Sequence, residues 1–314
     1  MALSRTPVEE LPMSVGCGPL FIALFPDCQG IHRTPLNSAL SYDAIMKIIR
    51  FYSEPIATFL FLNAGRAPGQ FYEDRLPVHH ARVDRMPEGI SAIVAAADLQ
   101  GRERFQDGLG GPIRLLGEVV PLRLIDEVFP QMRLDDPGRV GVFLAGDFYT
   151  VPALDKRGGT GDVTSVWRAF SECFAWVAGV AGNHDLFGDE QNTRPRCHSA
   201  MHFLDGETVD VDGLRIGGIG GIIGNPARPH RRDEDDYLRT LELVLEQQLD
   251  VLLMHEGPDG AESGQRGNSM IRAVLEQQPL MAIRGHAHWS EPFAQFPGGL
   301  QVLNVDARVV VLTD

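Results

Sequence analysis

Long apolar runs alternate with helical patterns in the part of the chain that follows residue 89. Within each run nearly every position is apolar, which is typical of a strand buried on both faces of a mainly parallel sheet. We expect five such strands, at residues 91–97, 139–145, 174–181, 249–254 and 280–283.

Between these runs, apolar residues recur every three or four positions, and this spacing predicts amphipathic helices. The expected helices cover residues 121–132, 164–173, 233–248 and 269–278. Strands that alternate with helices predict an α/β fold. Shorter strands are expected as antiparallel additions at residues 207–216, 300–304 and 308–312.

Residues 1–88 lack this regular alternation. The spacing of apolar residues predicts one helix at residues 38–52, and residues 58–62 have the pattern of a short strand. We therefore divide the chain into an N-terminal extension, residues 1–88, and a main domain, residues 89–314. The extension is expected to be either a small appended lobe or an arm that packs on the main domain.

The composition is that of a folded globular protein, and the net charge argues against one class of binding partner. Of the 314 residues, 44% are hydrophobic and 22% are charged, and the length allows one large domain or two modest ones. With 42 acidic and 28 basic residues, the formal net charge is -14. Such a field repels phosphate backbones, which argues against extended nucleic acid as a partner.

Cysteine usage and the N-terminal sequence favour a cytoplasmic location. None of the cysteines lies in a C-x-x-C pair, so we expect reduced thiols rather than a disulfide framework or a cysteine zinc site. They are Cys17, Cys28, Cys173 and Cys197. The apolar run at residues 19–26 is too short to span a membrane, and acidic rather than basic residues precede it. We therefore expect no membrane partner.

Polar residues of a restricted kind follow the five apolar runs. Because ligands of α/β sheets bind beyond the carboxyl ends of the strands, these residues are expected to converge on one crevice. In chain order they are Asp98-Leu99-Gln100, Gly146-Asp147, Gly182-Asn183-His184-Asp185, His255 and Gly285-His286-Ala287-His288. Carboxylate, amide and imidazole donors together suit Mn, Fe or Zn better than Ca or Mg alone. A metal site is therefore predicted at this crevice.

The order and type of these motifs resemble the calcineurin-like metallophosphoesterase family, which has D-x-H, G-D, G-N-H-D/E, a lone His after a strand, and G-H-x-H. The resemblance covers residues 89–314 and leaves residues 1–88 unexplained. It implies a four-layer α/β/β/α sandwich with metals at the strand ends. It also implies an enzyme that hydrolyses a phosphodiester or phosphomonoester of a small molecule or nucleotide.

By position, the resemblance implies two ligand sets that share Asp147. One divalent ion would be held by Asp98, Gln100, Asp147 and His288. The other would be held by Asp147, Asn183, His255 and His286. A bridging carboxylate suits two cations roughly 3.5–4 Å apart, and water held between them loses a proton near neutral pH to give the attacking hydroxide.

The resemblance also implies roles for residues beside these ligands. His184 would protonate the leaving group or steady the phosphoryl oxygens. Asp185 would orient the His184 ring through an N–H, with an ordinary exposed loop acid as the alternative. Arg102 and Arg284 would clamp phosphate oxygens, with a solvated or salt-bridged role as the alternative.

Gln100 stands where the family has His. It either ligates weakly through a neutral amide oxygen or holds a metal-bound water, and in both cases the first ion is expected to bind less tightly. The larger share of oxygen ligands favours Mn or Mg at that position. We take Mn as the leading candidate for the two ions, with Fe, Zn, Ni or Mg as others.

A non-catalytic scaffold on the same fold is the alternative function. Relatives of that kind lose ligands at several positions, whereas here only position 100 differs. There is no G-x-S-x-G nucleophile elbow, and the glycine-rich residues 158–161 lack the Lys-Ser/Thr of a phosphate loop. The expected partner is a small phosphoester, and residues 1–88 are a candidate contact for a homo-oligomer.

Overall fold

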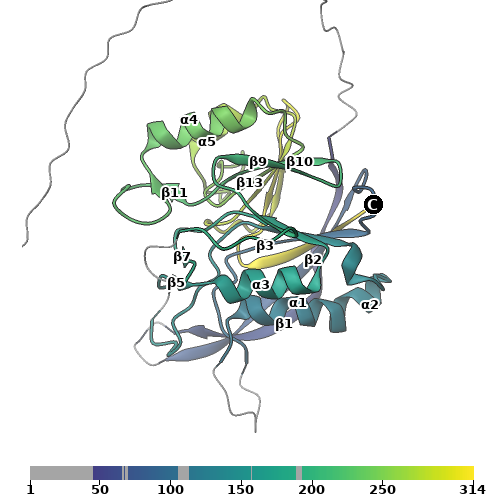
Figure 1. Ribbon diagram of the computed structural model, residues 1–314, viewed down its shortest axis with the longest axis vertical. Helices are drawn as coiled ribbons and strands as arrows, with labels where there is room; N and C mark the ends of the chain where they lie inside the picture. The colour runs from purple at the N-terminus through teal and green to yellow at the C-terminus, as the bar shows by residue number, and fades with distance from the viewer. Residues whose placement is uncertain (1–44, 66, 68–69, 105–112, 157, 189–192) are drawn as a thin grey trace, which may run out of the picture. The chain divides into compact units, whose positions relative to one another are not determined.

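Two large β-sheets with helices on their outer sides form the described part of the computed structural model (Figure 1). The structure describes residues 45–65, 67, 70–104, 113–156, 158–188 and 193–314, all within one unit, Tyr42–Asp314. Three features predicted from the sequence lie wholly or partly outside these residues. They are Cys17 and Cys28, the apolar run at residues 19–26, and the first part of the helix predicted at residues 38–52.

Among the described residues, the larger sheet has seven strands of mixed direction. Its order is β1 (Ile48–Ala64), β2 (Phe71–Val83), β17 (Arg308–Thr313), β3 (Ala92–Ala97), β4 (Val140–Leu144), β6 (Trp176–Gly179) and β8 (Met201–Phe203). Strands β3, β4, β6 and β8 are parallel, whereas β17 is antiparallel to β3. The antiparallel pair β1–β2 joins this sheet through the parallel pairing of β2 with β17.

The second sheet has six strands, and its four central strands are parallel. Its order is β15 (Phe293–Gln295), β16 (Gln301–Asn304), β14 (Met281–Arg284), β13 (Val251–Met254), β10 (Leu214–Ile219) and β9 (Glu207–Val211). Two short parallel pairs lie outside both sheets. They are β5 (Gly161–Asp162) with β7 (Asp185–Leu186), and β11 (Ile222–Ile223) with β12 (Arg231–Arg232).

Each sheet carries helices on one face (Figure 1). The seven-stranded sheet is covered by α1 (Leu116–Arg123), the π-helical turn η2 (Leu124–Val128), α2 (Phe129–Met132) and α3 (Thr164–Cys173). The six-stranded sheet is covered by α4 (Glu234–Leu245) and α5 (Ser269–Leu275). A 3-10 turn, η3 (Pro137–Arg139), leads into β4.

The apolar runs divide into two faces, as the pleat of a strand requires. In β13, Val251 and Leu253 pack in a core shared with the seven-stranded sheet, whereas Leu252 and Met254 pack in the core that contains α4 and α5. Strand β3 divides in the same way between the shared core and the helices of its own sheet. The sequence reads as a continuous apolar run because both faces of these strands are buried.

The five buried strands and the mixed α/β class predicted from the sequence are confirmed. Each predicted run contains one strand, namely β3, β4, β6, β13 and β14. The helix predicted at residues 121–132 begins earlier, at Leu116, and is divided into α1, η2 and α2. The antiparallel additions are only partly confirmed, since β9 is antiparallel to β10 but β16 is parallel to β14.

The helix predicted at residues 38–52 is wrong over its described C-terminal part, because β1 begins at Ile48. The short strand predicted at residues 58–62 lies inside β1, and β2 was not predicted. The β1–β2 ladder is interrupted between Tyr52 and Ala57, where Pro55 has no N–H to donate. This irregularity hides the period of two that identifies a strand. The domain boundary at residue 88 stays a prediction, although β1 and β2 are part of the main sheet.

Two further sequence predictions concern thiols and membranes. Cys173 and Cys197 are free thiols, as predicted. None of the helices in the described residues combines the length and apolar character of a membrane-spanning segment.

One buried side chain ties the start of β1 to the second sheet. The amide of Gln301 in β16 accepts from the Ile48 N–H at 2.8 Å and donates to the Ile48 carbonyl at 2.9 Å. Gln301 is 4% exposed, so no solvent replaces these bonds. Both polar groups of the Ile48 backbone therefore depend on this one side chain.

We expect Gln301→Met to lower the free energy of unfolding by about 2–4 kcal/mol, because it leaves a buried donor and a buried acceptor unpaired. Urea unfolding of the variant would measure this loss. Gln247→Met, at an exposed glutamine, is the matched control and should change stability by less than about 0.5 kcal/mol. Equal losses in the two variants would contradict the role given to Gln301.

Candidate metal centre

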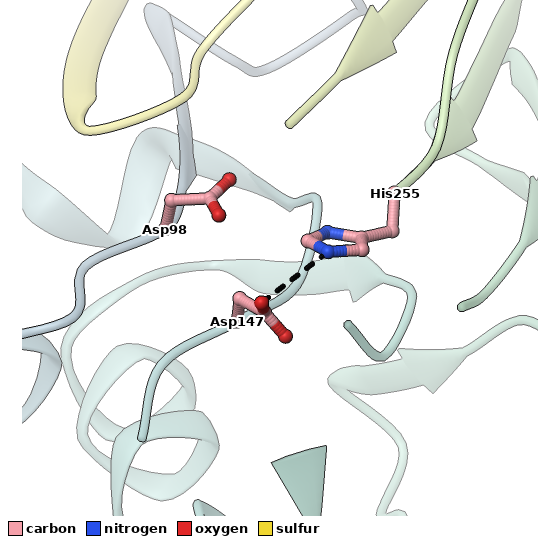
Figure 2. A group of neighbouring side chains, drawn as sticks. All are labelled: Asp98, Asp147 and His255. Atoms are coloured by element: carbon pink, nitrogen blue, oxygen red, sulfur yellow. Dashed lines mark ion pairs between the residues drawn. The ribbon is translucent and has the colours of Figure 1, made fainter. Parts of the chain in front are cut away.

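Three residues that follow parallel strands meet at the seam between the two sheets (Figure 2). Asp98 follows β3, Asp147 comes shortly after β4, and His255 follows β13. One ligand atom from each lies within 4.8 Å of the others. The seven-stranded sheet thus supplies two carboxylates and the six-stranded sheet supplies an imidazole, as expected at the carboxyl ends of parallel strands.

The backbone at this centre is left-handed at three residues that are not glycine. The φ angles are 52° at Asp98, 60° at Asp147 and 69° at His286. Such angles are unfavourable for residues with a Cβ and concentrate at functional sites. Here they turn the chain sharply at the strand end. The His286 N–H thereby reaches Asp98 and donates to its Oδ2 at 2.8 Å.

Two glycines of the predicted motifs allow this close approach. A Cβ at Gly182 would collide with the Asp147 carboxylate, and a Cβ at Gly285 would collide with Oδ2 of Asp98. The two carboxylates can occupy their positions only because Gly182 and Gly285 have no side chain.

Asp185 has a different set of partners from the one predicted. Its fully buried carboxylate accepts backbone N–H groups from Asp147, Phe148 and Gly182, each at 2.8 Å. Among the described residues, no hydrogen bond joins it to the His184 ring, whose Nδ1 is buried without a partner. Asp185 instead joins the loop after β4 to the loop after β6. It therefore fixes the backbone that carries Asp147.

Asp147 is surrounded by donors and is 3% exposed. Its Oδ1 accepts from the His184 backbone N–H at 2.9 Å, and its Oδ2 accepts from Nε2 of Gln100 at 3.2 Å. Nε2 of His255 lies 3.5 Å from the same Oδ2 (Figure 2). In this geometry the Gln100 amide supports Asp147 with its nitrogen.

Burial and mutual charge shift the pKa values of the cluster. Burial opposes a charge on His255, but the nearby carboxylates of Asp147 and Asp98 raise its pKa to about 10. Burial also opposes a charge on Asp147, yet His255 and His184 bring its pKa below the ordinary value. The pKa of Asp98 lies well above the ordinary value because of burial and the like charges of Asp306 and Asp147. The cluster thus retains protons that a divalent cation would displace.

The donor atoms of the cluster fit a divalent metal ion. Nε2 of His255 and Oδ1 of Asn183 are buried and have no hydrogen-bond partner among the described residues. Buried polar atoms are normally paired, so an unbonded imidazole nitrogen in the group of Asp98, Asp147 and His255 is consistent with a ligand that binds there. A cation would contact this nitrogen and offset the two carboxylates. Imidazole, amide and carboxylate donors together suit Mn, Fe or Zn.

A pocket of about 640 Å³ opens at the cluster and contains many of the predicted site residues. Its lining includes Asp98, Gln100, Asp147, His184, His286 and His288. Asn183 and His255 are buried beneath it, and the rings of His255 and His286 lie 5.1 Å apart. One accessible space is therefore bordered by residues from four of the five predicted motifs, and the fifth lies directly below.

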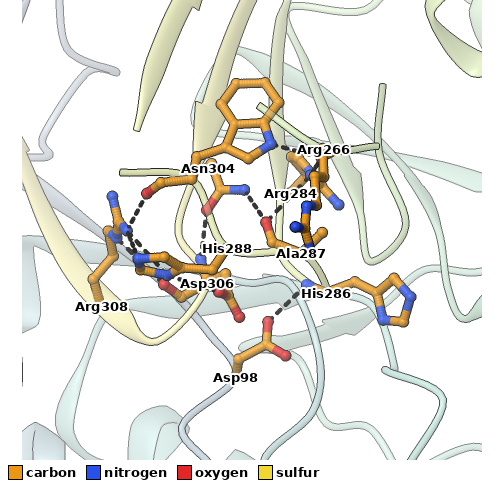
Figure 3. A network of polar contacts seen from close by, with 10 residues as sticks. Asp98, Arg266, Arg284, His286, Ala287, His288, Asn304, Asp306 and Arg308 are labelled. Carbon is orange, nitrogen blue, oxygen red and sulfur yellow. Dashed lines mark hydrogen bonds and ion pairs between the residues drawn. The ribbon is translucent and has the colours of Figure 1, made fainter. Parts of the chain in front are cut away.

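Asp306 was missed by the sequence analysis, and it holds one of the predicted ligands (Figure 3). Its Oδ2 lies 3.0 Å from Nδ1 of His288, and Nη2 of Arg308 lies 3.4 Å from the same ring. An acid bound to one ring nitrogen orients an imidazole for metal binding through the other. Asp306 comes shortly after the parallel strand β16, and this is the signal that could have found it.

The two arginines predicted to clamp phosphate are engaged elsewhere. The guanidinium of Arg102 donates to the carbonyl oxygens of Ile113, Thr150 and Val151, and it is 7% exposed. Arg284 is fully buried and donates to the Arg266 carbonyl at 2.9 Å (Figure 3). Neither side chain is part of the pocket lining. A phosphate contact for either residue stays a prediction.

Comparisons with known proteins give matches only among solved structures. No protein-family profile and no curated protein sequence matches it. Solved structures similar to it include three whose sequence identities and TM-scores are both low. TT1561 of Thermus thermophilus is 15% identical, with 68% of this chain and 88% of that chain covered and a TM-score of 0.45.

The other two matches are weaker. AQ665 of Aquifex aeolicus, a protein of unknown function, is 13% identical over 70% of this chain and 95% of that chain, with a TM-score of 0.32. The sulfate thiohydrolase SoxB of Thermus thermophilus, in complex with glycerol, is 15% identical over 71% of this chain and 53% of that chain, with a TM-score of 0.37. Likenesses of this degree assign neither family nor function.

We expect divalent metal binding to release protons and to strengthen with pH. The His255 imidazole ligates only when neutral, and its pKa of about 10 means that a metal ion displaces its proton near neutral pH. Affinity should therefore rise about tenfold per pH unit for each proton displaced. Calorimetric titration with Mn²⁺ in buffers of different ionisation enthalpy would count the released protons.

His255→Gln should release one proton fewer. His198→Gln, at an exposed histidine outside the pocket, is the matched control and should leave the proton count unchanged. Binding heats that do not depend on the buffer would contradict the assignment of His255 as a ligand.

Gln100→His tests whether residue 100 lies near a metal ion. An imidazole there should tighten one site by about 10–100-fold. It should also shift the preference from Mn²⁺ toward Fe²⁺ or Zn²⁺, because imidazole is the softer donor. Competitive metal titrations would measure both effects, with Gln131→His on α2 as the control. Identical affinities and preferences in wild type and Gln100→His would exclude residue 100 from the metal sites.

Proposed function

We propose that this chain is a hydrolase that uses two divalent metal ions, most readily Mn²⁺, to cleave a phosphoester of a small molecule or nucleotide. The observation that carries the proposal is the cluster of Asp98, Asp147 and His255, which three separate strands bring together at one pocket. The surrounding residues follow the motif order that the sequence shares with calcineurin-like metallophosphoesterases. The three apolar cores support the four-layer α/β/β/α arrangement expected for such proteins.

Two overlapping sets of residues would hold the ions. The first set is Asp98, Gln100, Asp147 and His288. The second set is Asp147, Asn183, His255 and His286. The central, donor-lined position of Asp147 supports its role as the shared ligand. The 5.1 Å spacing of the His255 and His286 rings supports their place in one set.

When bound, the ions would supply Lewis acidity toward phosphoryl oxygens and an activated water. The protein's own groups divide the remaining work. His184 lines the pocket and is proposed to give a proton to the leaving oxygen. Asp185 holds the Asp147 backbone in place through its three N–H contacts. Asp306 orients His288. With a net charge of -14, the chain suits a compact substrate rather than a polyanion.

We expect Asp147→Asn to lower bound metal and to reduce turnover by more than about 100-fold, because an amide is neutral and a poor bridge between cations. Metal-stripped protein reloaded with Mn, Fe, Zn, Ni or Mg would be assayed on p-nitrophenyl phosphate, bis-p-nitrophenyl phosphate and a nucleotide panel. Metal content would be measured on the same samples. Asp126→Asn, at an exposed position of η2, is the matched control.

The outcomes separate the proposal from its alternative. Metal binding without hydrolysis of any phosphoester in the panel would favour the scaffold function. Two tightly held ions and unchanged turnover in Asp147→Asn would remove Asp147 from the metal centre.

A further inference from the structure

The hairpin formed by β1 and β2 is one wall of the metal pocket, although no sequence motif pointed to it. Residues from both strands line the pocket together with the ligand cluster. They are Phe61, Asn63, Asp74, Arg75, Leu76 and Pro77. The β1–β2 hairpin thus contributes residues to the pocket that lie outside the five sequence motifs.

Sheet pairing explains why the hairpin reaches the site. Strand β2 runs parallel to β17, with Val78 opposite Val309. Arg75 lies three residues before Val78 on β2, and Asp306, which holds His288, lies two residues before β17 begins. Arg75 and Asp306 both line the pocket.

Arg75 is an exposed side chain with an unused charge. Of the described residues that line the pocket, it is the single arginine or lysine. Among the same residues, no hydrogen bond or ion pair engages its guanidinium, and its backbone N–H donates to Oδ1 of Asp74.

Among the described residues, the neighbouring acid Asp74 forms no ion pair with this guanidinium. Oδ2 of Asp74 accepts from Nδ2 of Asn63 at 3.1 Å and from the Tyr72 hydroxyl at 3.2 Å, and its Oδ1 accepts from the Arg75 backbone. The hydrogen bonds of Asp74 therefore stabilise the hairpin. The guanidinium N–H groups of Arg75 remain available to a ligand in the pocket.

In a chain of negative net charge, a positively charged side chain at the pocket would attract anionic ligands. The whole chain carries a net charge of -14 and so repels anions at long range. A guanidinium with free donors is matched best by phosphate or carboxylate oxygens, which it binds in pairs.

We propose that Arg75 binds an anionic group of the substrate at the pocket wall and so selects dianionic phosphoesters, such as monoesters and nucleotides with a terminal phosphate, over monoanionic diesters. This inference rests on the proposed phosphoesterase function. Arg75 acts in binding and takes no part in proton transfer or metal coordination. Its loss should therefore appear in KM rather than in kcat.

The test compares Arg75→Ala and Arg75→Lys with Arg82→Ala, an exposed arginine on the same strand outside the pocket. With Mn²⁺-loaded protein, Arg75→Ala should raise KM for p-nitrophenyl phosphate about 10-fold, the scale of a charge-assisted hydrogen bond. Its kcat should stay within about 2-fold, and KM for bis-p-nitrophenyl phosphate should change less than about 3-fold. Arg75→Lys keeps the charge and should recover part of the loss. Thermal unfolding would verify that all variants are folded.

Binding of inorganic phosphate to the Mn²⁺-loaded proteins, measured by calorimetry, gives a readout without turnover. Arg75→Ala should weaken it about 10-fold and Arg82→Ala should not. If this weakening occurs but no ester is hydrolysed, the Arg75 site stands and the proposed function fails. If esters are hydrolysed but Arg75→Ala matches Arg82→Ala in every measurement, the Arg75 proposal fails and the function stands. Absence of phosphate binding to wild type would also overturn the Arg75 proposal.

Discussion

The burial of two carboxylates beside each other is the constraint on which the rest of the site depends. Asp147 is 3% exposed and Asp98 is half-buried, and carboxylates in such surroundings are costly to keep charged without compensation. Backbone N–H groups, an imidazole and an amide offset part of this cost. The left-handed turns and the two glycines allow these donors to approach the carboxylates closely.

Both sheets contribute side chains around the two carboxylates. Asp98 and Asp147 come after strands of the seven-stranded sheet, whereas His255 and His286 come after strands of the six-stranded sheet. Asp306 lies on the connection between β16 of the second sheet and β17 of the first. The apolar core between the sheets packs residues from both sheets together, and so holds the strand ends of one sheet against those of the other. The hairpin β1–β2 extends the seven-stranded sheet and lines one side of the pocket.

The sequence predicted what depends on local pattern and missed what depends on distant partners. Buried parallel strands have a strong local signature, so β3, β4 and β13 and the residues that follow them were found. Strand β2 was missed because its place is set by pairing with β17 and its own pattern is irregular. The partners of Arg102 and Asp185 are backbone groups from other loops, which no motif records. Arg75 could be assigned to the pocket only from the structure, which shows the β1–β2 hairpin lining it.

The link between Ile48 and Gln301 joins positions 253 residues apart, and this separation affects how the pocket is assembled. Contacts between distant positions form late, because a long loop must close before they contribute any free energy. The hairpin is synthesised before the other described strands, yet it finds its sheet partner only once β17 has been made. During that interval its unpaired edge is open to wrong pairing. We therefore expect the wall that carries Arg75 to be among the last parts of the pocket to form.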